Sequence, residues 1–184
     1  MVTNGHLKTL QYKSHINIPA EKRTQLIGML NQHLADTLDL YTQVKQAHWN
    51  VKGMNFYQLH LLFDELATEL IGFVDLLAER ITTLGGIAMG TVRIAASASV
   101  LPEYPVGAID GKEHVEALVE RYGQYSSRVR TAIDDSDALG DKDTADLYTE
   151  ISRGVDMRLW FLEAHLQSSD EGSASVRAAL AQKA

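Results

Sequence analysis

The chain has 184 residues, of which 45% are hydrophobic and 22% are charged, as expected of a single soluble domain with a sizeable buried core. Acidic residues outnumber basic ones by 24 to 17, a formal net charge of −7, so a DNA-binding surface is not an average property of the chain. The lack of cysteine excludes disulfides, zinc–thiolate sites and thiol catalysis, and any metal must be held by nitrogen and oxygen ligands.

The sequence predicts a cytoplasmic protein with no membrane partner. The first residues lack the apolar core of a secretory signal, and no apolar run approaches the roughly 20 residues of a membrane span. Residues 1–18 and 168–184 are polar or of low complexity and are expected to form flexible N- and C-terminal tails. Residues 19–167 are then the one folded unit.

Two long helices are predicted in the first half of this unit. Pro19 suits the first turn of a helix, and apolar residues recur at helical spacing from there to about Val51. Gly53 interrupts the pattern, which resumes at Phe56 and ends before Gly85. The two helices are expected to form an antiparallel hairpin.

The second half begins with a long connection. Residues 85–106 contain glycines, two prolines and a run of small residues, which predicts a crossover with one short helix inside it. Two more helices are expected at about 110–135 and 142–167, joined by a flexible acidic link that starts at Asp134. The predicted fold class is therefore an all-α, ferritin-like four-helix bundle with a long crossover.

Two histidines and three acids in the first hairpin are candidate metal ligands. His48 and His60 are each six residues from the middle of the predicted turn, which places them at about the same height on adjacent helices. On the second helix, His60 and Asp64 are four residues apart, and so are Asp75 and Glu79. Each pair therefore shares one helix face, one turn apart.

A single chain cannot bring these two pairs together. His60 and Asp75 are 15 residues apart, or ~22 Å along a straight helix, although both point to roughly the same side. A twofold axis near Ala67 and Thr68 would lay a second copy of this helix antiparallel to the first. His60 of one subunit would then face Asp75 and Glu79 of the other, which predicts two identical intersubunit sites per dimer.

Imidazole and carboxylate ligands suit iron or zinc, and a site with few protein ligands leaves positions open for water or an oxidant. We interpret the pattern as a site of iron oxidation between subunits. The structural alternative is that the histidines are packing residues and the acids face water. A structural role is the interpretation for five further histidines: His6, His15, His33, His114 and His165. Trp49 and Trp160 are expected in the core, although a tryptophan beside a metal site could also absorb stray oxidising equivalents.

The chain contains no Glu-x-x-His, the motif that two helices of a standard ferritin-like di-iron site supply. The nearest combination, Glu163 and His165, has the wrong separation for one helix face. A di-iron centre inside one subunit is therefore not expected, and the bundle core is predicted to be packing alone.

At these residues the sequence resembles the Dps family, the DNA-binding proteins from starved cells, which are ferritin-like mini-cages. His48–Gly53, HWNVKG, is similar to the first family signature, and Val74–Gly86, VDLLAERITTLGG, is similar to the second. The similarity spans about residues 20–167, including the pattern LWFLE that starts at Leu159.

The resemblance implies a hollow homo-dodecamer in which ferroxidase sites at twofold interfaces oxidise Fe(II), preferentially with hydrogen peroxide, and ferric mineral collects inside. It assigns metal-binding and catalytic roles to His48, His60 and Asp64 of one subunit and to Asp75 and Glu79 of its partner. Glu79 would anchor the main iron, and Asp75 and His60 would complete its ligands. His48 and Asp64 would serve a weaker second iron or its waters. Two-electron oxidation by peroxide avoids releasing hydroxyl radicals.

Iron must enter such a cage through a pore. The resemblance places the start of the last helix at a threefold pore, where three copies of each acid would concentrate cations by their summed field. Asp141, Asp146 and Glu150 are the expected lining residues, since steps of five and four keep them near one helix face. The alternative is that this acidic segment is a solvated loop.

DNA binding in the family depends on tails rich in lysine or arginine, because phosphate neutralisation supplies most nonspecific affinity. Here the N-terminal tail offers only Lys8 and Lys13, so DNA binding is not expected at neutral pH and becomes more favourable if the tail histidines become charged. Two alternative functions stay open: a DNA-condensing architectural protein, and a cage whose intersubunit site holds zinc and is poorly active.

Overall fold

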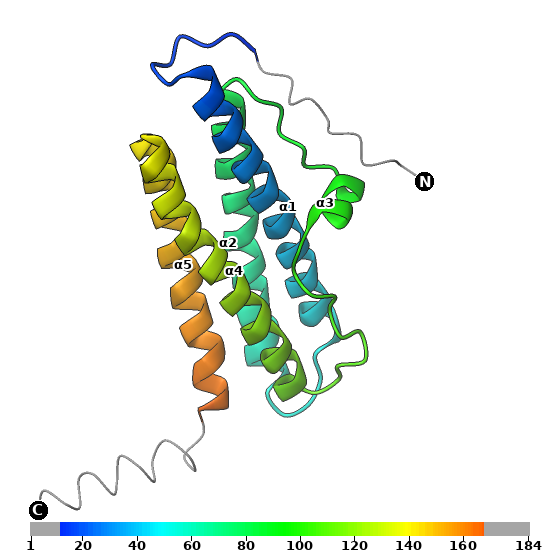
Figure 1. Ribbon diagram of the computed structural model, residues 1–184. Helices are drawn as coiled ribbons and strands as arrows, with labels where there is room; N and C mark the ends of the chain where they lie inside the picture. The colour runs from blue at the N-terminus through cyan, green and yellow to red at the C-terminus, as the bar shows by residue number, and fades with distance from the viewer. Residues whose placement is uncertain (1–11, 168–184) are drawn as a thin grey trace, which may run out of the picture.

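The computed structural model describes residues 12–167, which form five α-helices and the segments that connect them (Figure 1). The helices are α1 (Ala20–Asn50), α2 (Phe56–Thr83), α3 (Val92–Ala98), α4 (Gly111–Leu139) and α5 (Lys142–Leu166). No helix in this part of the chain is long and apolar enough to cross a membrane.

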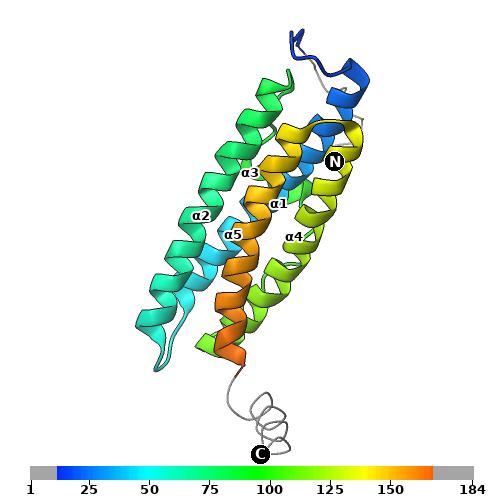
Figure 2. The same ribbon diagram turned by 90° about the vertical axis from the view of Figure 1, so that its left-hand side faces the viewer.

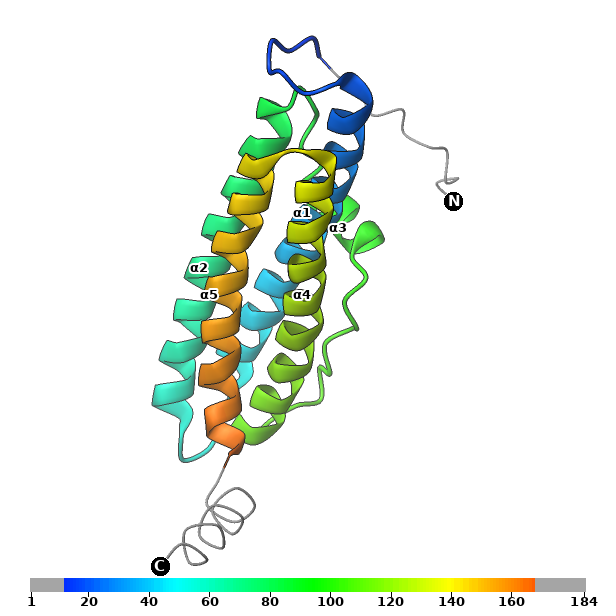
Figure 3. The ribbon, with the colours of Figure 1, turned by 60° about the vertical axis from the view of Figure 1, so that its left-hand side comes forward.

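The four long helices form two antiparallel hairpins that lie side by side (Figures 1 and 2). One hairpin is α1 with α2 and the other is α4 with α5, and contacts of α1 with α4 and of α2 with α5 join them. The crossover from α2 to α4 runs along the outside of α1 and carries α3 (Figure 3). The predicted all-α, ferritin-like bundle with a long crossover and a short helix inside it is confirmed.

The core is formed by the apolar face that each long helix turns inward. Its largest fully buried side chains include Phe63 and three tyrosines, Tyr122, Tyr125 and Tyr148. Each fully buried leucine or phenylalanine contributes about 1.5–3 kcal/mol relative to exposure. Packing of these faces, rather than helix propensity alone, therefore holds the bundle together.

Glycine and aspartate determine where the long helices turn. Gly53 has a φ of 103°, a left-handed conformation that glycine adopts without strain, in the short turn between α1 and α2. At the start of α4, the Asp110 side chain accepts a hydrogen bond from the backbone N–H of Glu113. The Glu113 side chain accepts one from the backbone N–H of Asp110 in return. This capping box ends the crossover at a defined residue.

The predicted flexible link at Asp134 is wrong, because α4 continues through this acidic segment to Leu139. Ser136 is fully buried, and its hydroxyl donates to the carbonyl of Ala132, so this last turn packs into the bundle while the acids face outward. The helix ends at Gly140, whose φ of 84° closes a two-residue turn with Asp141. Acidic residues on an exposed helix face have the same composition as a solvated loop, so composition alone does not distinguish the two.

Buried polar side chains hold the crossover against the bundle. Asp36 is fully buried and accepts hydrogen bonds from the side chain of Gln32 and from the backbone N–H of Val100. The guanidinium of Arg121 donates to the side chain of Gln43 and to the backbone carbonyl of Glu103. The crossover is thus fixed to both α1 and α4.

The chain before α1 and the first turn of α1 are both anchored at the end of α2. The backbone N–H of Tyr12 donates to the carbonyl of Gly85 at 2.7 Å, and the Arg23 guanidinium donates to the carbonyl of Leu84 at 2.8 Å. The rest of the two predicted tails, residues 1–11 and 168–184, lies outside the described residues.

Candidate metal site

The imidazole rings of His48 and His60 lie face to face where α1 and α2 meet the turn. Their centroids are 3.8 Å apart with an angle of 19° between the ring planes. The Nδ1 atom of His48 lies 2.8 Å from the backbone carbonyl oxygen of His60, and Nδ1 of His60 lies 2.9 Å from the carbonyl of His48. The two rings therefore meet at the height that their equal distance from the turn predicts.

These reciprocal hydrogen bonds determine which ring nitrogen carries the proton. A carbonyl oxygen can only accept, so Nδ1 of each ring must be the N–H donor. In a neutral imidazole the other nitrogen, Nε2, then keeps its lone pair. Both histidines thus present an Nε2 lone pair that could bind a metal, and the backbone of the opposite helix holds each ring in place, an arrangement typical of metal-ligating histidines.

Asp64 lies one turn after His60, as expected, but its strongest contact is with a lysine. Its Oδ1 atom is 2.8 Å from Nζ of Lys45 and 3.9 Å from Nε2 of His48. The hydrogen bond and the charge of Lys45 lower the pKa of Asp64, so the carboxylate stays ionised. The Lys45 ammonium also lies 5.8 Å from the centre of the Trp49 ring.

The sequence interpretation did not include Lys45. It lies three residues before His48, so both share one face of α1. That spacing is the signal that could have identified it.

Asp75 and Glu79 lie toward the other end of α2, and both are exposed. The helix is continuous from Phe56 to Thr83, so the histidines and these two acids stay apart within one subunit. In residues 12–167, no three His, Asp or Glu side chains come together closely enough to hold a metal ion. Large apolar side chains on the same helix, Leu61 and Ile71, are also exposed, at 44% and 43%.

The three expected pore residues have different surroundings. Asp146 and Glu150 are exposed on α5. Asp141 is 2% exposed; its two carboxylate oxygens accept hydrogen bonds from Arg80, and it also accepts the backbone N–H of Thr144 to cap α5. Burial alone would raise the pKa of Asp141, but the hydrogen bonds from Thr144 and Arg80 outweigh it and lower the pKa. Its carboxylate is directed into the subunit.

The other histidines and the tryptophans are also placed. His33 and His114 are buried in the bundle, whereas His15 and His165 are exposed and His6 lies outside the described residues. The expectation that the tryptophans lie in the core is wrong, because Trp49 is 65% exposed and Trp160 is 60% exposed. Both lie on outward faces of their helices.

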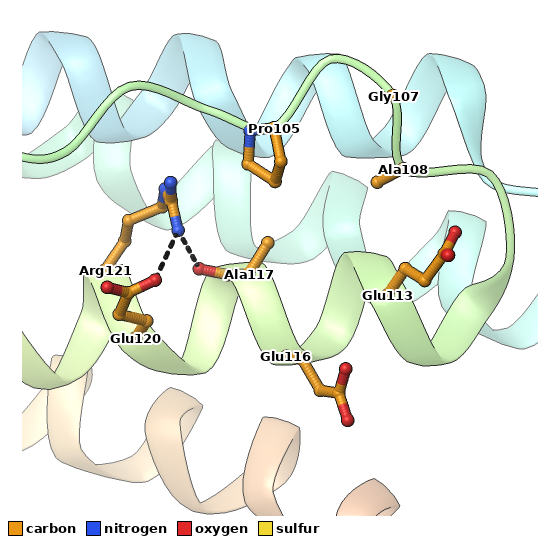
Figure 4. A pocket seen from close by; sticks show the side chains of 8 residues that line it. All are labelled: Pro105, Gly107, Ala108, Glu113, Glu116, Ala117, Glu120 and Arg121. Carbon is orange, nitrogen blue, oxygen red and sulfur yellow. Dashed lines mark hydrogen bonds and ion pairs between the residues drawn. The ribbon is translucent and has the colours of Figure 1, made fainter.

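A pocket of about 500 Å³ lies between the crossover and the first turns of α4, and neither candidate histidine lines it (Figure 4). It is lined by three glutamates, each with a structural partner. Glu113 accepts backbone N–H groups at the start of α4, Glu116 lies 3.6 Å from the Lys112 ammonium, and Glu120 lies 3.1 Å from the Arg121 guanidinium. We therefore assign this pocket a structural role.

Comparison with known proteins extends these observations. The model of the ferritin-like domain family matches residues 27–170. The DNA protection during starvation protein of Agrobacterium fabrum is 44% identical over 156 residues, which cover 85% of this chain and 96% of that protein. Among solved structures, DpsA14 from Streptomyces coelicolor has a TM-score of 0.83 at 30% identity and covers 88% of this chain and 95% of its own.

A further solved structure is the Dps protein of Vibrio cholerae O1, which is described as a member of a broad superfamily of ferritin-like diiron-carboxylate proteins. It has a TM-score of 0.79 at 28% identity and covers 84% of this chain and 97% of its own.

The bundle, its crossover and the domain match define a ferritin-like protein. Within this class the chain belongs to the Dps family, as the identity to a DNA protection during starvation protein over almost the whole of that relative shows. The resemblance found in the two signature segments is confirmed.

Proposed function

We propose that the protein is a ferroxidase and iron-storage protein that oxidises Fe(II), preferably with hydrogen peroxide, at sites shared between two subunits. The observation that carries this proposal is the His48–His60 arrangement, in which two imidazoles present free Nε2 lone pairs, while α2 holds Asp75 about 22 Å and Glu79 about 28 Å from His60. The family supports iron as the metal, since a relative is described as a diiron-carboxylate protein.

The donor set suits iron as a substrate that binds, reacts and leaves. Two imidazoles and three carboxylates match the preference of ferrous and ferric iron for nitrogen and oxygen ligands, and a site this open leaves room for water and peroxide. Two Fe(II) ions and one hydrogen peroxide with two protons give two Fe(III) ions and two waters, so no hydroxyl radical is released. Ferric product would then collect as mineral. The reaction thus removes Fe(II) and hydrogen peroxide, the two reagents of oxidative damage.

The exposed face of α2 supports a partner in the antiparallel orientation. Thr68 lies on the exposed side of α2, midway between His60 and Asp75, while Ala67 is buried. A twofold axis passing close to Thr68 brings His60 of one subunit to Asp75 and Glu79 of the other. Exposed Leu61 and Ile71 would lie in the same interface and lose their water contact there.

In this arrangement each ligand has a distinct role. Glu79 anchors the main iron, with Asp75 and His60 completing its ligands. His48 and Asp64 hold the second iron or its waters more weakly, because Lys45 already neutralises the Asp64 carboxylate. Zinc remains an alternative occupant, since the same donors bind it.

We further propose that twelve subunits form a cytoplasmic hollow cage and that Asp146 and Glu150 line its iron entrance. Both are exposed and one turn apart on α5, so three copies of each would sum their fields at a threefold pore. Asp141 contributes through structure instead, by holding the start of α5 against α2.

DNA condensation is the second candidate, and the name of the Agrobacterium relative favours it. A net charge of −7 per subunit opposes it, since the shell would repel phosphate at neutral pH. Iron oxidation therefore stands first.

Mixed assembly of two inactive variants tests whether the site is shared. A chain with His60→Ala and a chain with Asp75→Ala should each oxidise Fe(II) slowly when assembled alone. In a mixed dimer, the intact Asp75 of the first chain meets the intact His60 of the second. Random pairing of equal amounts should restore about a quarter of the wild-type sites and of the fast oxidation rate measured with peroxide.

The control is a single chain that carries both substitutions and therefore contributes neither His60 nor Asp75 to a site. When it is mixed with either single variant, the oxidation rate should not exceed that of the single variant alone. A mixture of the two single variants that stays as slow as its components would overturn the intersubunit assignment. Assembly size is measured for every sample, so that loss of activity is not confused with loss of the particle.

A further inference from the structure

A buried tyrosine–histidine pair links the crossover to α4. The hydroxyl of Tyr104 lies 2.6 Å from Nδ1 of His114, and the two rings are stacked with centroids 6.1 Å apart. Tyr104 is 6% exposed and His114 is 1% exposed. The proposed function makes no use of this Tyr104–His114 pair.

The phenol is the donor in this hydrogen bond. Nε2 of His114 is buried without a hydrogen-bond partner among the described residues. If the imidazole donated from Nδ1, the phenolic proton and the Nε2 lone pair would both be left unsatisfied. Donation by the phenol leaves one group unsatisfied instead of two, so it is the less costly arrangement. Nδ1 of His114 then accepts this hydrogen bond and can act as a base toward the Tyr104 proton.

The pair lies beside the proposed metal site. The ring of His114 contacts that of Phe63 edge-on, with centroids 6.5 Å apart, and Phe63 is one turn beyond His60 on α2. Trp49, which follows His48, lines the same pocket of about 570 Å³ as Tyr104. Phe63 and Trp49, which are close in sequence to the two candidate histidines, thus lie near the Tyr104–His114 pair.

The other buried tyrosines lack such a partner. The hydroxyl of Tyr122 has no hydrogen-bond partner among the described residues, and that of Tyr125 bonds the hydroxyl of Thr37, which is not a base at neutral pH. Tyr148 lies 3.1 Å from Nδ1 of His33, but that nitrogen is also 3.0 Å from a backbone carbonyl. Among the buried tyrosines of the described residues, Tyr104 is therefore the one whose imidazole partner nitrogen has no second hydrogen-bond partner.

We propose that Tyr104 is a one-electron oxidation site that quenches strong oxidants escaping from the metal site, with His114 as its proton acceptor. The proposal rests on the proposed function for the source of the oxidant, a hydroxyl-radical-class species formed when a single Fe(II) meets peroxide. The oxidant gains one electron from the phenol, the O–H bond of Tyr104 breaks, and its proton moves to Nδ1 of His114. A further Fe(II) returns the electron, giving Fe(III), and the imidazolium returns the proton.

The surroundings favour loss of the electron and the proton together. The guanidinium carbon of Arg121 lies 5.6 Å from the centre of the Tyr104 ring, so a positively charged phenol radical is disfavoured there. Burial raises the pKa of Tyr104 and lowers that of His114, so at neutral pH the phenol is protonated and the imidazole is neutral. The proton is thus present on the donor, and the acceptor is free to take it.

Photochemical oxidation tests this pair without iron. The assembled protein, labelled with ring-deuterated tyrosine, is illuminated with a ruthenium tris-bipyridine sensitiser and persulfate and then freeze-trapped for electron paramagnetic resonance. We expect a tyrosyl signal with an exchangeable proton coupling that is lost in Tyr104→Phe. The matched control is Tyr122→Phe, which removes an equally buried hydroxyl that has no base, and it should keep the signal. His114→Gln should reduce the signal to background while Tyr104 remains in place.

A signal that persists in Tyr104→Phe, or that is unchanged in His114→Gln, overturns the proposal. A second arm replaces the sensitiser with Fe(II) and peroxide and separates this proposal from the proposed function. A Tyr104 radical in the photochemical arm with no iron oxidation in the second removes the ferroxidase and keeps the redox pair, whereas iron oxidation without a Tyr104 radical in either arm removes the pair.

Discussion

At the scale of single residues, the candidate site depends on where two protons lie. His48 and His60 exchange Nδ1–H bonds with each other's backbone carbonyls, which leaves both Nε2 atoms as acceptors. Spacing along the chain predicted that the two rings meet, because they are equally far from a turn. It could not predict the tautomer, since that depends on the relative rotation of two helices. The same holds for Lys45, whose bond to Asp64 requires both helices in place.

One prediction at this scale concerns the ion pair of Lys45 with Asp64. Lys45→Met keeps the length of the side chain and removes its charge, so the pKa of Asp64 should rise toward the ordinary carboxyl range. A carboxyl nuclear magnetic resonance titration of selectively labelled Asp64 measures it. Because the folded-state pKa is the depressed one, the pair stabilises the protein above the unfolded pKa and loses this effect as pH falls through the folded pKa.

Lys52→Met is the matched control, since Lys52 is an exposed lysine near the same turn and Lys45 stays in place. The pKa of Asp64 should be unchanged in this variant. An equal rise in both variants would mean that the general charge of the hairpin, and not the hydrogen bond from Lys45, lowers the pKa.

At the scale of elements, the role of Asp141 depends on the joint between α2 and α5, which is the ion pair of Arg80 with Asp141. The α4–α5 turn is only Gly140 and Asp141, and the Asp141 carboxylate is buried against Arg80. Asp141 therefore serves as a helix cap and a bridge between hairpins. An acid at this position of the sequence looks the same as its exposed neighbours, because burial is a property of the packed helices.

Replacing Asp141 should destabilise the protein strongly. Asp141→Ala leaves the Arg80 guanidinium, 13% exposed, without its carboxylate, and the loss expected for breaking such a pair is about 3–5 kcal/mol of unfolding free energy. Denaturant unfolding at fixed protein concentration measures the change. Since the folded-state pKa of Asp141 is lowered, the difference from wild type should be full near neutral pH and shrink as pH falls through that pKa.

Asp143→Ala provides the comparison, because the Asp143 side chain is 85% exposed and 3.9 Å from the same guanidinium. Its effect should stay within about 0.5 kcal/mol. Equal losses in the two variants would show that the turn, rather than the buried carboxylate, is what stabilises the joint.

At the scale of the whole molecule, the surface of one subunit carries candidate ligands that do not form a complete site, and exposed apolar side chains, within its described residues. The two groups of candidate ligands on α2 lie apart, two acids on α5 face outward, and Leu61 and Ile71 are exposed on the same helix as the candidate ligands. Each is explained if further copies of the chain complete it. The assembly is therefore part of the proposed chemistry and not only a container for the mineral.

The proposed entrance predicts how iron uptake responds to charge. Asp146→Asn combined with Glu150→Gln should slow Fe(II) uptake by the assembled cage roughly tenfold at low ionic strength, because the field that concentrates the cation is lost. Stopped-flow absorbance measures the rate over a series of salt concentrations. The salt dependence should flatten in the same variant, since screening then has less charge to act on.

Asp134→Asn with Asp135→Asn removes the same amount of charge from the exposed end of α4 and should slow uptake less. Should this control slow uptake as much as the α5 variant, overall charge rather than a pore at the start of α5 would govern entry.

The four long helices, the hairpin turn and the family could all be predicted from the sequence, because helical periodicity, glycine positions and two signature segments are local properties of the chain. The sequence also placed His48 beside His60, since two residues equally distant from a turn must meet in a hairpin. Local composition failed at Asp134–Leu139 and at the tryptophans, where exposure depends on what packs alongside.

Packing of the helices determines which polar atoms are free and which have a partner. Asp141 forms an ion pair with Arg80, and Asp64 forms one with Lys45. Tyr104 is hydrogen-bonded to His114, 10 residues away along the chain. The reason is physical: a hydrogen bond or ion pair depends on distances of a few ångströms between separate elements, and spacing along one chain does not specify those distances.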